Sequence, residues 1–284
     1  MRTHRIIRAV VASVAALSMT TLAACSNSSS DNSSTPSASS TSAAVDLGVA
    51  TPGTLNIGTI TDAKPYAYSE NGELKGFEID LIKAAADKLN LKPQFTTMDF
   101  SGLLAAVNNS QFDVGASAIG ITADRKKLVD FSHGYLAGYF SLLTKNKKVT
   151  SLDDVKGKKV GVLQGSIQDA NSATLIPGAV VVRFPDTNAA KQALKTDRVD
   201  GLFIDFETAL AETKVDSTLS IPFNVSAKGF PAGWAVKKGN QKLLDALNKA
   251  LDEVIADGTW LKLYKQYFPE DPVPTGSDLP PYIV

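Results

Sequence analysis

Three cations follow a predicted strand at a place where local structure gives no reason for them. In SAIGITADRKK (117–127) the first residues end a buried strand, Thr122 is a helix N-cap, and Arg125, Lys126 and Lys127 fill the first helical turn. A helix N-terminus already carries partial positive charge, so each cation there costs roughly a few tenths of a kcal/mol. The positive charge therefore asks for an explanation outside the helix.

Two other polar groups also follow predicted strands. Ser166 and Asp169 are spaced as a capping box, a local structural role that needs no ligand. Asp205 ends the apolar run DGLFID, where it either caps the next helix or faces a ligand. In open α/β sheets ligands bind beyond the carboxyl ends of strands, so we expect the loops at these ends to line one cleft. These loops are 60–68, 117–125, 163–169 and Asp205-Phe206.

The elements that position these loops form two consecutive α/β series. The first has predicted strands 55–60, 94–98 and 113–118, with helices over 76–91 and about 102–108. After a break at 144–148, the second has strands 158–163, 180–184 and 200–205, with helices after residue 166 and over 189–194. This alternation predicts parallel strands with right-handed crossovers. A strand-like start at 233 and a helical stripe that includes Leu243, Leu247 and Leu251 follow.

The composition is that of an ordinary globular protein. The 284 residues are 44% hydrophobic and 20% charged, and the formal net charge of zero gives no reason to expect nucleic acid as a partner. Beyond residue 24 the only histidine is His133, and no residues have the spacing of a nucleophile with its base or of a metal site. We therefore predict no catalytic residue, no metal and no cofactor.

The first 24 residues are typical of a signal peptide rather than of a fold. A basic start precedes an apolar run that is too interrupted for a membrane span of about 20 apolar residues. LAAC (22–25) resembles the lipobox of bacterial lipoproteins, which implies a diacylglyceryl group on Cys25, with acyl chains such as palmitate. A free thiol beside an unrelated signal peptide is the alternative. Residues 26–42 contain ten serines and no large apolar side chain, so we expect a disordered tether over 25–53.

Five motifs, taken in order, resemble one protein family. They are GFEIDL (76–81), FDVGASAIGITADRKKLVDFS (112–132), SLDDVKGKKVGVLQGS (151–166), LKTDRVDGLFID (194–205) and GTW (258–260). The family is the bacterial extracellular solute-binding proteins of the polar amino-acid class, family 3. The resemblance implies an α/β, two-lobed, periplasmic-binding-protein-like fold of type II, whose cleft lies between lobes joined by two hinge strands. It implies that lobe 1 comprises 54–143 plus 233–284 and lobe 2 comprises 144–232.

The resemblance also implies roles for particular residues. Arg125 matches the family arginine that holds the ligand α-carboxylate by a two-pronged salt bridge, with backbone N–H groups of the helix N-terminus on the same anion. A solvated surface arginine is the alternative, and Lys126 and Lys127 match no motif position. Asp205 matches the acid that pairs with the ligand ammonium, and Phe100 matches a stacking aromatic that otherwise belongs to the core. The expected ligand-binding residues are Tyr66 (or Tyr68), Phe100, Ser117, Ala118, Gly120, Arg125, Gln164, Ser166, Ile167 and Asp205, with Asp169 open between binding and capping.

Some positions depart from the family pattern. Ile60 stands where members that take cationic side chains often have an acid, and Ala63 stands where a tyrosine is frequent. Gly120 replaces a hydroxyl residue that commonly helps to hold the amino group. A basic amino acid is therefore disfavoured as the ligand. Asp62 and Lys64 are candidates for a different polar contact.

These features together predict a lipid-anchored receptor on the extracytoplasmic face of the cell membrane. We expect a monomer that closes its lobes on a small carboxylate-bearing solute, such as a polar amino acid, and delivers it to an ABC permease. A dehydratase-like enzyme is one alternative, because fold does not fix function. A ligand-sensing lipoprotein is another.

Overall fold

The computed structural model describes residues 46–275 and 280–282, which contain two five-stranded sheets and one small three-stranded sheet. The predicted signal peptide, Cys25 and the tether up to residue 45 lie outside the described residues. Within the part that is described, no helix combines the length and the apolar character that crossing a membrane needs.

The first large sheet has the strand order β5-β1-β6-β13-β7. β5, β1 and β6 run parallel, as predicted, whereas β13 runs antiparallel between β6 and β7. The strand predicted over 113–118 is present over only two residues. The strands are β1 (Thr54–Thr59), β5 (Lys92–Thr97), β6 (Val114–Gly115), β7 (Val129–Phe131) and β13 (Ala235–Lys237).

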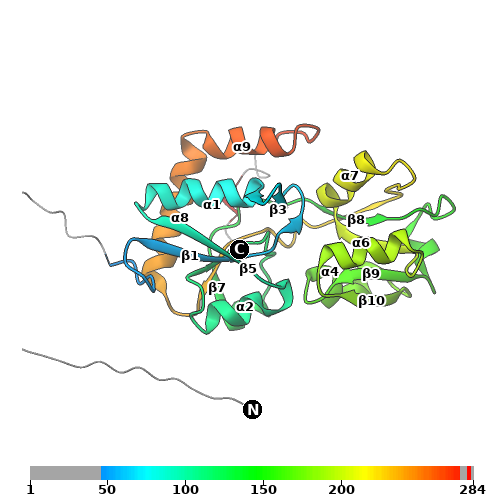
Figure 1. Cartoon of the computed structure of the whole chain (residues 1–284), viewed down its shortest axis with the longest axis horizontal. Helices are drawn as coiled ribbons and strands as arrows, with labels where there is room; N and C mark the ends of the chain where they lie inside the picture. Colours follow the sequence, from blue (N-terminus) through cyan, green and yellow to red (C-terminus); the bar gives the residue numbers. More distant parts are fainter. Residues whose placement is uncertain (1–45, 276–279, 283–284) are drawn as a thin grey trace, which may run out of the picture. The chain divides into compact units, whose positions relative to one another are not determined.

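Helices cover both faces of this sheet. α1 and α9 lie above it in Figure 1 and α2 lies below it, while α8 packs on α1 and α9. The predicted helical stripe is confirmed, because Leu243, Leu247 and Leu251 are fully buried beside Phe77 and Trp260. The helices are α1 (Phe77–Lys88), α2 (Phe100–Asn108), α8 (Gln241–Ala256) and α9 (Thr259–Tyr267).

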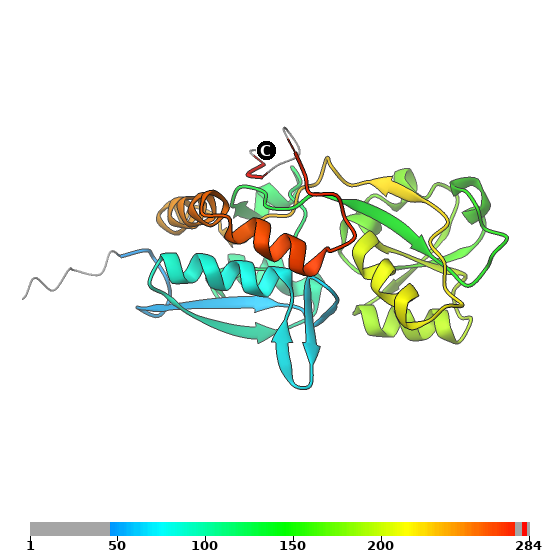
Figure 2. The same cartoon turned by 90° about the horizontal axis from the view of Figure 1, so that it is seen from above.

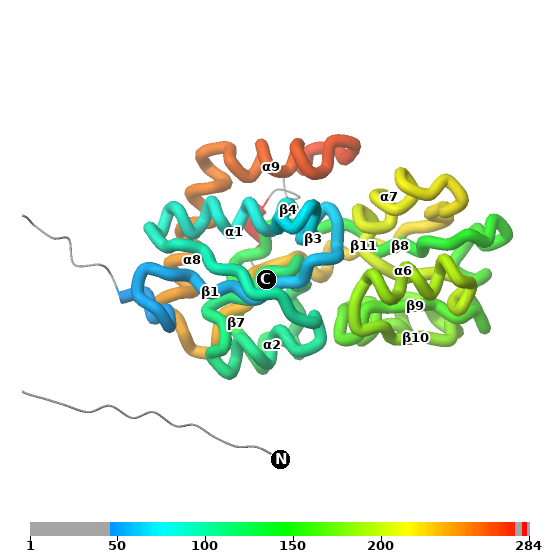
Figure 3. The backbone as a smooth tube through the Cα atoms, viewed as in Figure 1, coloured from blue at the N-terminus to red at the C-terminus, as the bar shows by residue number. Residues whose placement is uncertain are grey.

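The second large sheet has the order β10-β9-β11-β8-β12. β10, β9 and β11 run parallel, as predicted, and β8 and β12 complete the sheet in antiparallel fashion. Its strands are β8 (Tyr139–Leu143), β9 (Lys159–Leu163), β10 (Val180–Phe184), β11 (Gly201–Asp205) and β12 (Asn224–Ser226). Its helices are α4 (Ile167–Ala170), α5 (Ser172–Leu175), α6 (Thr187–Lys195), α7 (Phe206–Val215) and the 3-10 helix η1 (Leu152–Val155). Figure 3 traces the backbone of both sheets.

Each large sheet has its own core and thus defines a lobe. Leu55 and Phe77 belong to the main cluster of lobe 1, while Val162 and Phe203 belong to a separate cluster of lobe 2. The chain crosses between the lobes after β7 and again after β12, and the two crossings pair through the bridge of Leu136 with Ala232. Strand pairing assigns 139–143 to the sheet of lobe 2, so the division expected after residue 143 is better drawn before β8.

The segment expected as a simple loop over 60–68 folds as part of a small sheet. This sheet consists of β2 (Asp62–Ala63), β3 (Ala67–Glu70) and β4 (Glu73–Lys75), in the order β2-β3-β4. The β3–β4 hairpin is the cyan pair of strands in Figure 2. Gly76 follows it with a φ of 130°, and a Cβ there would overlap the backbone carbonyl of Tyr66, which explains the glycine of the GFEIDL motif.

Candidate ligand-binding site

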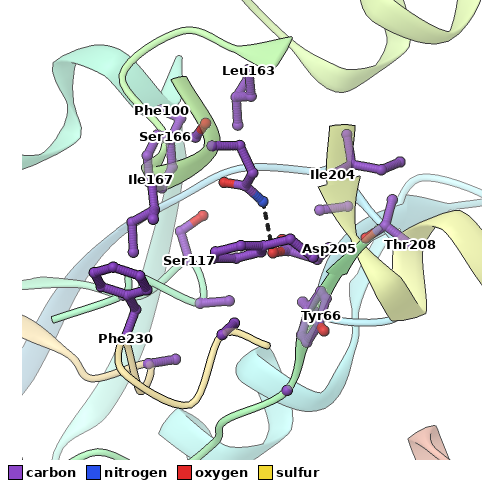
Figure 4. Close-up of a pocket in the computed structure, with 18 of the residues that line it drawn as sticks. Tyr66, Phe100, Ser117, Leu163, Ser166, Ile167, Ile204, Asp205, Thr208 and Phe230 are labelled. Carbon is purple, nitrogen blue, oxygen red and sulfur yellow. Dashed lines mark hydrogen bonds between the residues drawn. The ribbon is translucent and has the colours of Figure 1, made fainter. Parts of the chain in front are cut away.

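A pocket of about 100 Å³ lies between the two lobes, and both lobes contribute to its wall (Figure 4). All four segments predicted to face one cleft contribute residues to it. The lining residues are Ile60, Ala63, Tyr66, Ala67, Phe100, Ser117, Ala118, Gly120, Arg125, Leu136, Ala137, Gly138, Tyr139, Phe140, Leu163, Ser166, Ile167, Gln168, Thr187, Phe203, Ile204, Asp205, Thr208, Ala227, Phe230 and Ala232.

Arg125 of lobe 1 lines the pocket, and its half-buried guanidinium bonds a carbonyl oxygen of each lobe. Its Nη1 donates to the Gly120 carbonyl oxygen at 2.7 Å, and its Nη2 donates to the Gly165 carbonyl oxygen of lobe 2 at 2.9 Å. The guanidinium carbon lies 5.5 Å from the centre of the Phe100 ring, within cation–π range. Burial lowers the pKa of Arg125 to about 10, which leaves it protonated at neutral pH. A guanidinium has five N–H donors, so three are left for an anion.

The helix expected after Thr122 is only one turn long. α3 spans Arg125–Leu128, and the backbone N–H of Arg125 donates to the Thr122 hydroxyl at 3.1 Å. The helix is thus shorter than predicted, and a single turn has little macrodipole to oppose the cations. The Thr122 hydroxyl accepts the N–H three residues later, which is the N-cap pattern predicted for it, so the Arg125 N–H is not free for an anion.

Asp205 approaches the same pocket from lobe 2. It occupies the N-cap position of α7, but its side chain makes no capping hydrogen bond. Instead its Oδ1 accepts a hydrogen bond from the Gln168 amide at 3.0 Å, which is the dashed contact to Asp205 in Figure 4. Burial raises the pKa of Asp205 to about 6, against the opposing effects of the Gln168 hydrogen bond and the Arg125 charge. Asp205 is thus a mostly ionised, partly buried carboxylate at neutral pH.

Two buried hydroxyls in the pocket have no hydrogen-bond partner among the described residues. They are Ser117 Oγ on lobe 1 and Thr208 Oγ1 on lobe 2, and their residues are 5% and 3% exposed. A buried polar group without a partner is costly, so both hydroxyls are ready to bond a ligand. Ser117 was predicted from the sequence. Thr208 was missed, although it lies three residues after Asp205 and therefore on the same side of α7.

The loop after β9 separates into lining and non-lining residues. Ser166 and Ile167 line the pocket, and Ser166 also caps α4 by accepting the Asp169 N–H at 3.1 Å. Asp169 lies outside the lining and instead binds Arg183 and the Gly165 N–H, which favours its structural role. Gln164, expected among the ligand-binding residues, is exposed and does not line the pocket.

Of the three aromatic residues predicted at the site, Tyr66 and Phe100 line the pocket and Tyr68 does not. Tyr66 is buried in its wall, and burial together with the nearby Asp205 carboxylate raises its pKa well above the usual range. Tyr68 lines no part of the wall and instead packs under the Lys64 ammonium, 4.9 Å from the ring centre. Phe100 lines the pocket and also packs against the lobe 1 core, so its position fits a stacking aromatic as well as a core residue.

A buried carboxyl lies directly behind the lobe 1 side of the pocket. Glu78 is fully buried in α1, and the Tyr135 hydroxyl donates to its Oε2 at 2.5 Å. Burial raises the pKa of Glu78 to about 7, while the hydrogen bond from the Tyr135 hydroxyl opposes the rise. Ala118 has a φ of 46°, unusual for a residue other than glycine.

The site contains no recognisable metal centre. In the described ranges, no group of three or more His, Cys, Asp or Glu side chains is arranged to hold a metal ion. Ile60, Ala63 and Gly120 all line the pocket, so the three positions that depart from the family pattern are pocket positions.

Comparison with known proteins finds one matching family model and several sequence relatives named as amino-acid-binding proteins. A family model described as bacterial extracellular solute-binding proteins, family 3, matches residues 55–270. The chain is 35% identical over 219 residues to the arginine-binding extracellular protein ArtP of Bacillus subtilis, covering 75% of this chain and 86% of that protein. It is 31% identical over 217 residues to a probable histidine-binding protein of Campylobacter jejuni, covering 75% and 84%.

Solved structures agree with the sequence relatives. An ancestral arginine-binding protein bound to arginine is 41% identical, with a TM-score of 0.71, and the match covers 76% of this chain and 98% of that chain. This similarity, together with the two sheets described above, confirms the predicted two-lobed fold with a cleft between lobes joined by two crossing segments.

Proposed function

Because the chain belongs to the bacterial extracellular solute-binding proteins, family 3, we propose that its cleft captures a small carboxylate-bearing solute, with an amino acid as the expected ligand. The protein, closed on its ligand, then delivers the solute to the permease of an ABC importer. The observation that carries the proposal is one guanidinium, Arg125 of lobe 1, and one carboxylate, Asp205 of lobe 2, on the wall of a single pocket. Opposite charges on opposite lobes match the two ends of a zwitterion.

The size of the pocket supports a small ligand. One water-sized sphere needs ~10–15 Å³ on the same scale, so about 100 Å³ is room for roughly seven to ten groups of that size. The carboxylate of an amino acid would take the free donors of Arg125, and its ammonium would approach Asp205 in place of the Gln168 amide. Ser117 and Ser166 offer further hydroxyls from the two lobes.

Capture by closure follows from the division of these groups between lobes. A ligand held by Arg125 alone touches one lobe, and the contact with Asp205 forms only when the lobes approach. The ligand therefore favours the closed state through contacts that only closure completes. A micromolar dissociation constant corresponds to about 8 kcal/mol in total, which a few charge-assisted hydrogen bonds and aromatic burial account for.

The test is ligand-induced stabilisation of the purified protein across a panel of metabolites. A ligand that binds only the folded state raises the apparent melting temperature. We expect a carboxylate-bearing hit whose shift disappears in Arg125→Ala and persists in Arg198→Ala, which removes an exposed arginine outside the pocket lining. An uncharged sugar as the best hit, or an Arg125→Ala protein that responds like the parent, would refute the proposal. Recovery of the hit unchanged after incubation separates binding from dehydratase activity.

The lipid anchor is part of the same proposal. The sequence LAAC, with the Ser-rich stretch after it, supports a diacylglyceryl modification of Cys25 that tethers the receptor to the cell membrane. We expect Cys25→Ser to move the protein from the membrane fraction into the soluble fraction without changing its affinity for the ligand. A Cys25→Ser protein that stays with the membranes would refute the anchor and leave the binding function untouched.

A further inference from the structure

We infer that the pocket selects an amino acid whose side chain is uncharged, an inference that rests on the proposed function and narrows it. Of the described residues that line the pocket, only Arg125 and Asp205 are charged at neutral pH. One guanidinium and one carboxylate neutralise the α-carboxylate and the α-ammonium of the ligand. No counter-charge on the wall is left for a third ionised group.

The two charged residues that flank Ala63 of the pocket wall, Asp62 and Lys64, are already paired elsewhere. The carboxylate of Asp62 accepts hydrogen bonds from the backbone N–H groups of Thr187 and Asn188, and Asp62 is not part of the pocket wall. The ammonium of Lys64 lies 3.4 Å from Glu70 and above the Tyr68 ring, away from the lining. Neither is available to a cationic or an anionic side chain in the pocket.

The remaining wall is mostly apolar. Besides the small hydroxyl and amide groups, it consists of aromatic and aliphatic side chains from both lobes, including Ile60, Phe140, Phe203 and Phe230. Burying an unpaired charge against such a wall is far more costly than burying an uncharged side chain. We expect a cationic or anionic side chain to weaken binding by about a hundredfold or more relative to the best uncharged one.

Calorimetric titration of the purified protein at pH 7.5 tests this selectivity. The panel contains glutamine, threonine, methionine and leucine, then lysine and arginine, then glutamate. We expect the tight ligands to come from the first group alone. If lysine, arginine or glutamate binds within tenfold of the best uncharged amino acid, the selectivity is refuted while the receptor function stands. If no amino acid binds, the proposed function fails instead.

A matched pair of variants tests the missing counter-charge directly. Ile60 is buried at the end of β1 and lines the pocket, so Ile60→Asp adds a carboxylate to the wall and Ile60→Asn adds a similar shape without charge. We expect Ile60→Asp to gain lysine or arginine binding by tenfold or more over Ile60→Asn. Equal binding of lysine by two correctly folded variants would overturn the electrostatic explanation.

An independent observation concerns Asp62, and we propose that this residue stabilises the closed state as a cap across the cleft. It lies in β2 beside lobe 1, and its Oδ2 accepts the Thr187 N–H at 2.5 Å and the Asn188 N–H at 3.2 Å. These are the first two N–H groups of α6 in lobe 2, and the next one, of Ala189, is bonded by Asp186 within the same lobe. The two N–H groups that α6 leaves without a partner in its own lobe therefore donate to a carboxylate beside the opposite lobe.

Such a cap exists only when the lobes are together, so its loss affects the rate at which a bound ligand escapes. We expect Asp62→Ala to speed ligand dissociation, measured by stopped-flow fluorescence, by about two- to thirtyfold, the range of a lost N-cap. Its ligand-free melting temperature and its order of ligand preference stay unchanged. Asp186→Ala is the matched control, because it removes a cap of the same helix from within lobe 2. Asp62→Ala with unchanged dissociation, or with the ligand-free destabilisation expected of Asp186→Ala, would refute the cap.

Discussion

The substitution Gly120→Ala tests whether the closed cleft is the ligand-bound state. The residue lies on lobe 1, lines the pocket and faces Ile167 of lobe 2. A Cβ added at Gly120 would overlap Ile167 Cδ1 and would lie 3.3 Å from the Phe230 carbonyl oxygen. Because the overlap joins opposite lobes, Gly120→Ala should leave an open form unaffected and penalise closure.

The free-energy cost of closure in Gly120→Ala depends on which atoms around the added Cβ can move away. Ile167 Cδ1 is the tip of a side chain and relieves part of the overlap, but Ile167 is only 5% exposed in the lobe 2 core, and the Phe230 carbonyl is backbone. We therefore place the cost at about 1–2 kcal/mol, the lower part of the range for overpacking. This corresponds to a dissociation constant about 5- to 30-fold higher.

Calorimetric titration of the identified ligand measures this change, with ligand-free thermal unfolding alongside. Ile167→Val removes the Cδ1 atom that collides, so the double variant Gly120→Ala/Ile167→Val should recover most of the affinity that Gly120→Ala loses in the parent background. Unchanged affinity in Gly120→Ala, or an equal loss in both backgrounds, would mean that the two residues do not meet in the bound state.

Three further predictions concern the polar groups of the site. Because Asp205 must be ionised to bind an ammonium and has a pKa of about 6, affinity should fall as pH drops through 6, to about one tenth of its full value at pH 5, with a flat profile in Asp205→Asn. Since the Gln168 hydrogen bond lowers the pKa of Asp205, Gln168→Leu should move the midpoint of the binding profile to higher pH; an unmoved midpoint would contradict the contact. Ser117→Ala should weaken binding about two- to twelvefold and leave ligand-free unfolding unchanged or slightly stabilised, because its hydroxyl has no protein partner in the described structure; equal effects on both would assign it a purely structural role.

The sequence predicts the parallel strands and the location of the cleft because both depend on local patterns. The run VVVRF is strand β10 over its full predicted length, and Asp205 ends β11 at the pocket, where the strand predicted over 200–205 places it. Insertion of β13 between β6 and β7 depends on contacts between residues more than a hundred positions apart, which no local pattern records. The hairpin over 62–75 was missed because its strands are very short.

Individual site residues were harder to predict than the loops that carry them. At the end of β9, Leu163 and Ser166 line the pocket while Gln164 between them is exposed, a distinction set by the turn and not by residue type. Gln168 lies in α4 and Asp205 ends β11, so only the folded chain reveals the hydrogen bond between them. The one-turn length of α3 also depends on tertiary structure, since β7 begins directly after it at Val129.

The crossing of the chain between lobes has a consequence for biosynthesis. Every strand of the second sheet lies within one uninterrupted stretch, 139–226, whereas the first sheet lacks an inner strand until 235–237 has been made. As the polypeptide emerges from its N-terminus, the lobe that starts later is the first whose sheet can be finished. A fragment truncated at residue 226 would retain a complete second sheet beside a first sheet with a gap between β6 and β7.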